Sequence, residues 1–193
     1  MRIAVLLCLI LLFATYSSIG QDLSSNIVTY GVGSGFSWSE GLDAPGGHHV
    51  TVGYSRATRN SRIRLSSQLM FGSYFKESKT TVDQFNTNLD LDMYLEFDLI
   101  RIRAFSLVLL GGGYLRKTVA MRGTGYEGDY HQQIMVTESK TFNTNSLGWL
   151  SSAGLSFALP KKQWAVTFLP LLIKNSPQGG GFYASIQYSL RLK

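Results

Sequence analysis

The chain has 193 residues, with 18 Lys and Arg against 12 Asp and Glu, 20 Gly, 4 Pro and a single cysteine. This length suits one domain, and because Cys8 lies inside an apolar N-terminal run, the remainder has no disulfide framework, catalytic thiol or cysteine-based metal site. The formal net charge of +6 does not indicate nucleic-acid binding, since no basic helix or RNA-binding motif accompanies it.

The N-terminus has the three parts of a secretory signal peptide. They are one arginine, an apolar run over residues 3–13, and small residues at Ser18 and Gly20 where a signal peptidase reads. The apolar run is shorter than the roughly 20 residues that a transmembrane helix needs. We therefore predict that residues 1–20 are removed on export and that residues 21–193 form the mature domain.

Eight later segments alternate apolar and polar residues, which is the period of a β-strand. The stretch from Asn86 to Asp98 shows it most clearly, with Leu89, Leu91, Met93, Leu95 and Phe97 on one side and Asp90, Asp92, Glu96 and Asp98 on the other. Pro170, inside the seventh segment, predicts a bulge or strand end. In chain order, the predicted strands cover residues 27–37, 48–56, 62–75, 86–98, 103–115, 147–159, 164–173 and 182–192.

The predicted connections alternate between long and short. The long ones cover residues 39–47, 76–84, 116–146 and 174–181, and the short ones cover 57–61, 98–102 and 160–163. Barrels inserted into a membrane from one side show this asymmetry, with short periplasmic turns and longer outside loops. We predict an all-β fold, an eight-stranded antiparallel up-and-down transmembrane β-barrel whose apolar face meets lipid. The alternative is a soluble periplasmic lipocalin-like carrier, in which the apolar face points inward.

This pattern resembles the small eight-stranded outer-membrane β-barrels of Gram-negative bacteria, the OmpA-like and OmpX-like group. Gln21, directly after the predicted cleavage site, is similar to exported proteins of Bacteroidota, and the last strand, Phe182 to Lys193, resembles the signal read by the outer-membrane assembly machinery. The resemblance implies a location in the bacterial outer membrane. Its implied partners are lipopolysaccharide and phospholipid, the assembly machinery, and other outer-membrane or periplasmic proteins, without nucleic acid.

The acidic side of the fourth strand predicts a ladder of charges inside the barrel. If the third and fourth strands form a hairpin centred near residue 80, Arg64 faces Glu96 and Arg62 faces Asp98. A bound cation or an acid/base pair remain alternatives for these carboxylates. The predicted lumen ladder consists of Arg62, Arg64, Asp90, Asp92, Glu96 and Asp98.

The other polar features predict contact surfaces more than chemistry. We expect the histidines His48, His49 and His131 to lie in solvated loops, and Gly31, Gly33 and Gly35 to form a small-residue face inside the barrel. Residues 118–122 and 132–137 are expected to extend as a hairpin above the membrane. The candidate partner contacts are Tyr126, Tyr130 and His131 in the third outside connection, and Arg56, Arg59, Lys161 and Lys162 in a basic rim at the periplasmic end.

No catalytic, cofactor or metal site is assigned from these residues. An eight-stranded barrel is just wide enough for its side chains to fill it, so a diffusion pore is not expected. The predicted function is that of a non-enzymatic structural or interaction protein, an accessory subunit of a larger outer-membrane complex. The alternative in the same fold is a lipid A-modifying enzyme that uses histidine with serine and an acidic residue.

Overall fold

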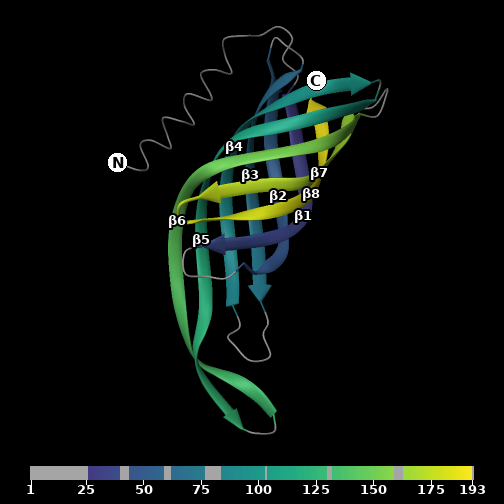
Figure 1. The fold of residues 1–193 in the computed structure, drawn as a ribbon. Helices are drawn as coiled ribbons and strands as arrows, with labels where there is room; N and C mark the ends of the chain where they lie inside the picture. Colours follow the sequence, from purple (N-terminus) through teal and green to yellow (C-terminus); the bar gives the residue numbers. More distant parts are fainter. Residues whose placement is uncertain are drawn as a thin grey trace.

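The chain folds into a closed antiparallel barrel (Figure 1). A computed structural model describes residues 26–39, 44–58, 62–76, 84–102, 104–129, 132–158 and 163–192, with the backbone alone within 124–138. Each strand pairs with the next, and β8 pairs with β1, which confirms the predicted eight-stranded up-and-down fold. The predicted signal peptide lies outside the described residues. The strands are β1 Asn26–Ser39, β2 Gly46–Ala57, β3 Ile63–Lys76, β4 Gln84–Ile102, β5 Phe105–Asp129, β6 Gln132–Ala158, β7 Trp164–Ser176 and β8 Gly179–Leu192.

The two faces of the wall follow the alternation in the sequence. In β4, Leu89 and Leu95 are exposed on the outside, whereas Asp90 and Asp92 are buried inside. An apolar exterior and a polar interior are the reverse of a soluble barrel and match a wall surrounded by lipid. None of the described segments is a helix long and apolar enough to cross a membrane. The exposed belt includes Val32, Val50, Phe71, Leu109, Leu155, Phe168 and Ile186.

The exterior of β5 and β6 also shows where the apolar belt ends. On β6, Leu147 is 66% exposed, and the next outward residues, beginning with Asn145 and Asn143, are polar and exposed. On β5 the outward residue after Leu115 is Lys117. Val119 and Met121 follow Lys117 on the outer face of β5 and are again apolar and exposed, so β5 leaves the belt only after Met121, whereas β6 leaves it at Leu147.

Beyond Arg122, where β4 stops pairing with β5, β5 and β6 continue as a two-stranded hairpin, which stands clear of the other strands (Figure 1). Their ladder runs to the pair Asp129 and Gln132, about 45 Å along the strand from Leu115. The predicted connection over residues 116–146 is therefore wrong for most of its length. Polar residues on both faces hide the period of two there, although the hairpin expected within it is present. We call this end of the barrel the hairpin end.

At the opposite end, Asn26 of β1 pairs with Leu192 of β8, so both described termini share one rim, which we call the terminal end. Pro170 lies in an irregular stretch of β7, where the pairing with β8 shifts between Leu169 and Leu172. The predicted bulge at this proline is thus confirmed, because proline has no N–H to donate to the ladder.

Candidate functional site

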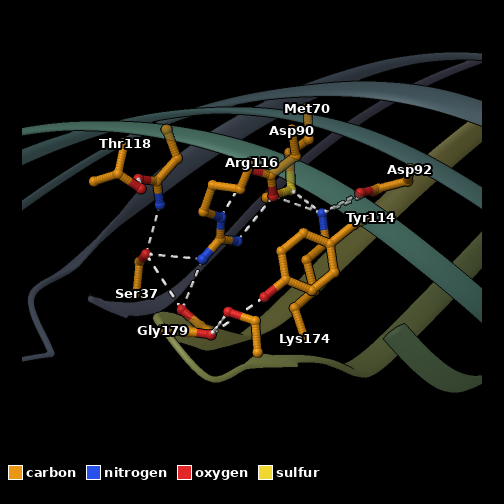
Figure 2. A network of polar contacts seen from close by, with 12 residues as sticks. Ser37, Met70, Asp90, Asp92, Tyr114, Arg116, Thr118, Lys174 and Gly179 are labelled. Carbon is orange, nitrogen blue, oxygen red and sulfur yellow. Dashed lines mark hydrogen bonds and ion pairs between the residues drawn. The ribbon is translucent and has the colours of Figure 1, made fainter. Parts of the chain in front are cut away.

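Four buried charged side chains meet in the middle of the lumen (Figure 2). Arg116 donates from Nε to Asp90 Oδ1 and from a terminal nitrogen to Asp90 Oδ2, both at 2.8 Å. Lys174 Nζ bonds Asp90 Oδ2 at 2.7 Å and the two carboxylate oxygens of Asp92 at 2.6 and 2.8 Å. Two positive and two negative groups balance, as a buried cluster requires. We call these four residues the central network.

The central network connects strands that are far apart in the sequence. Arg116 also donates to the carbonyl oxygen of Gly180 at 2.8 Å and to the hydroxyl of Tyr183 at 2.6 Å. Its members come from β4, β5 and β7, and these further bonds reach β8. Removing one member of such a buried group leaves an opposite charge unpaired, which lowers the free energy of unfolding by about 3–5 kcal/mol.

Large side chains close the lumen around the central network. Tyr74, Tyr114 and Tyr183 are fully buried there, and the ring of Tyr114 lies 5.4 Å from Lys174 Nζ. Met70 lies beside the same ammonium, with its sulfur 3.8 Å from Nζ. The described side chains therefore fill the middle of the barrel, which leaves it without the wide interior of a porin.

A second charged cluster lies toward the terminal end. The β3–β4 register places Arg64 opposite Glu96, and the two side chains form an ion pair. Arg64 also donates to Asp98 Oδ1 at 2.8 Å, and Arg101 bonds the other oxygen of Asp98. Arg62 lies opposite Asp98 in the backbone pairing. The backbone N–H of Asp98 donates to the carbonyl oxygen of Arg62 at 2.8 Å.

The structure thus divides the predicted ladder into two parts. Glu96 and Asp98 pair with Arg64 of β3 and Arg101 of β4, whereas Asp90 and Asp92 bond Arg116 and Lys174. Sequence reasoning missed these two cations because it placed both in outside connections. For Arg116 the signal was present, since the inward period of two on β5 continues through Leu110, Gly112 and Tyr114 to the arginine.

The expectation of solvated loop histidines is wrong for His48 and His49, which both lie in β2. His48 faces outward and is exposed, whereas His49 points inward, is 3% exposed, and packs edge-on against Tyr183 with ring centroids 5.5 Å apart. Gly33 makes the room for it, because an added Cβ there would lie 2.6 Å from the His49 ring. The predicted small-residue face of β1 therefore lies inside the barrel beside the inward ring of His49.

The predicted partner contacts are mostly outside the described side chains. Arg56 is half-buried on β2 near the terminal end, opposite Asn26 and Leu65. Tyr126 lies in β5 within the stretch whose backbone alone is described. Among the described residues, no three His, Cys, Asp or Glu side chains form a group that could hold a metal ion. Tyr130, His131, Arg59, Lys161 and Lys162 lie outside the described residues.

Comparison with known proteins relates the chain to others by its fold. No protein-family model and no curated sequence matches it. Ail, the attachment invasion locus protein of Yersinia pestis, is 13% identical over 88% of this chain and 98% of its own, with a TM-score of 0.52. Neisserial surface protein A is 11% identical over 89% of this chain and 100% of its own, with a TM-score of 0.54.

A further Ail structure, in complex with the heparin analogue sucrose octasulfate, is 13% identical over 88% of this chain and 99% of its own, with a TM-score of 0.51. Sequence identities this low show a shared fold and nothing about function. The closed antiparallel barrel of this chain, with its apolar exterior, has the fold of the small eight-stranded β-barrels of the bacterial outer membrane, which confirms the predicted fold and location.

Proposed function

We propose that the protein is a non-enzymatic outer-membrane barrel that presents the β5–β6 hairpin to another protein, as an accessory subunit of a larger outer-membrane complex. The observation that carries this proposal is the length of the hairpin. On one side β4 stops opposite Arg122 of β5, and on the other β7 stops opposite Trp149 of β6, while the ladder continues to Asp129. A long connection with regular structure of its own is where recognition is usually found.

The base of the hairpin supports this role, because the central network fixes it. Arg116 is the inward residue of β5 between Leu115 and Lys117, a few residues before Arg122, where β4 stops pairing with β5. Its bonds hold β5 to Asp90 of β4 and Gly180 of β8. A hairpin held this way loses less conformational freedom when it binds than a flexible loop does.

The other proposed partners follow from the wall and its assembly. The apolar belt contacts outer-membrane lipid, and the predicted basic rim, to which Arg56 belongs, meets headgroups or an acidic periplasmic partner. Residues 1–20 act as the signal peptide, and β8 carries the signal for the assembly machinery. Folding then requires no ligand, since the central network balances its own charges.

Shortening the hairpin tests the interaction role. Replacing residues 124–138 by Asn-Gly joins Gly123 to Ser139, which are paired in the ladder, through a two-residue turn that suits a hairpin. Proteins that co-purify with the full chain from native outer membranes in mild detergent should be lost. The matched control is Pro177→Ala in the turn between β7 and β8 at the same end, which should keep them. Identical co-purifying proteins from the shortened variant and the full chain would contradict the proposal.

One observation favours the alternative of a lipid-modifying enzyme. The register aligns Ser34, His48 and Ser73 on the lipid-facing side of β1, β2 and β3. Extending this row to its neighbours adds Ala184 and Thr87, so it contains no acidic residue. Mass spectrometry of lipid A from cells with His48→Ala separates the two functions, because a changed lipid A profile would favour the enzyme and an unchanged one the interaction protein.

A further inference from the structure

The terminal end of the lumen holds a cavity of about 360 Å³, lined by residues of all eight strands. This volume lies within the range of small-molecule sites. Its inner limit is a buried hydrogen-bonded layer in which Gln68 Oε1 accepts from the hydroxyl of Tyr94 at 3.2 Å and from Gln187 Nε2 at 3.0 Å. The filled middle of the barrel lies beyond this layer. The cavity is therefore a blind cup that opens at the terminal end, the end predicted to face the periplasm, and we call it the terminal cup.

One wall of the terminal cup carries three arginines, among them the exposed Arg191, and two carboxylates. Arg64, Glu96, Asp98 and Arg101 line it and form ion pairs with one another. The side chains of Arg64 and Glu96 are each only 15% exposed, so an apolar occupant would remove their remaining water at a cost. A strongly anionic occupant would face the two carboxylates together with the three arginines. Because four of these five charged groups are already paired with one another, the wall suits a polar molecule without a strong charge.

The remaining wall is rich in hydroxyl groups that keep hydrogen-bonding capacity. Thr29 and Ser189 bond each other at 3.2 Å, and Thr167 donates to Ser156 at 3.0 Å. A pair of hydroxyls holds two protons and uses one between its members, so each pair still has one O–H to donate and lone pairs to accept. The hydroxyl of Ser106 also lies on this lining.

We propose that the terminal cup binds a small neutral sugar from the periplasm. A sugar matches both walls, because its hydroxyls donate to carboxylates, accept from guanidinium groups and pair with the serine and threonine hydroxyls. This site is independent of the hairpin and adds to the function proposed above. The blind end limits the ligand to one or two rings, since the layer of Gln68, Tyr94 and Gln187 closes the cup.

The test is saturation-transfer NMR on the full chain in lipid nanodiscs, free of sugar-based detergent. The probes are glucose and sucrose, with glucose 6-phosphate as the charged counterpart. The blocking variant Ser106→Phe adds an aromatic ring to the lining without removing a hydrogen bond that the described residues make. The control is Leu155→Phe, which adds a ring to the exposed outer face beside Leu107.

We expect the wild type and Leu155→Phe to bind a neutral sugar equally, and Ser106→Phe to bind at least about tenfold more weakly. Retention of the heat-dependent gel shift shows that each variant folds, and Ser106→Val replaces Ser106→Phe if the larger ring prevents folding. The shortened hairpin variant should bind sugar as the full chain does, so failure of one proposal leaves the other standing. No transfer to either neutral sugar, equal binding by Ser106→Phe, or stronger binding of glucose 6-phosphate would overturn the inference.

Discussion

Replacing Lys174 by methionine tests whether the central network holds the barrel together. The ammonium group is 0% exposed and makes three hydrogen bonds to Asp90 and Asp92. Methionine has a similar length, so the change removes the charge and leaves little cavity. It leaves two buried carboxylates facing one arginine, and we expect Lys174→Met to lower the free energy of unfolding by about 3–5 kcal/mol. Urea unfolding of the refolded barrel in phospholipid vesicles, followed by tryptophan fluorescence, measures this difference.

The second step of this experiment removes the unpaired charge again. In Lys174→Met combined with Asp92→Asn, only Asp90 and Arg116 remain charged, and they keep their two hydrogen bonds. The double variant should therefore be more stable than Lys174→Met alone. The matched control is Lys140→Met on the exposed hairpin, which should change stability by less than about 0.5 kcal/mol. A Lys174→Met barrel as stable as the control, or a double variant as damaged as the single one, would refute the reasoning.

Three further outcomes follow from the same structure. Exchanging Arg64 and Glu96 together should give a barrel less stable than the wild type, because another acidic side chain lies beside Arg64, but more stable than either single reversal in urea unfolding. Equal damage in all three variants would show that the register does not matter. Gly33→Val should lower the free energy of unfolding by about 1–3 kcal/mol, because the valine side chain would meet the ring of His49. Gly111→Ala should leave the free energy of unfolding unchanged in the same assay, because an added Cβ there meets nothing within 4 Å. In planar bilayers the purified barrel should give no steady open-channel current, and a stable conductance would contradict the filled lumen.

The fold was predictable because each strand carries its own pattern. Alternation identifies the strands and their faces, and a hairpin centred near residue 80 was enough to place Arg64 opposite Glu96. These features depend on neighbours in sequence. A residue that faces inward on one strand is known as soon as the period of that strand is known.

The central network was not predictable in the same way, because it depends on closure of the barrel. Lys174 bonds Asp92 across 82 positions in the sequence, and nothing in either strand alone selects the other as its partner. The irregular stretch near Pro170 also decides which side of β7 faces inward after it, so the alternation in the sequence does not place Lys174 inside. His49 differs, because the inward period of two on β2 continues from Thr51 to His49, and the neighbouring strand supplies only the space at Gly33.

The position of the central network links the stability of the barrel to its proposed function. A buried group of charges is a weak source of stability, since well-packed apolar residues often serve as well. It does define geometry, because Arg116 can satisfy Asp90, Gly180 and Tyr183 only in one register of β4, β5 and β8. That register is set on β5 beyond the last β6–β7 pair and a few residues before β4 stops pairing with β5 at Arg122. The charges inside the barrel thus fix the register at the base of the hairpin, and a loss of the central network should loosen that base before it unfolds the wall.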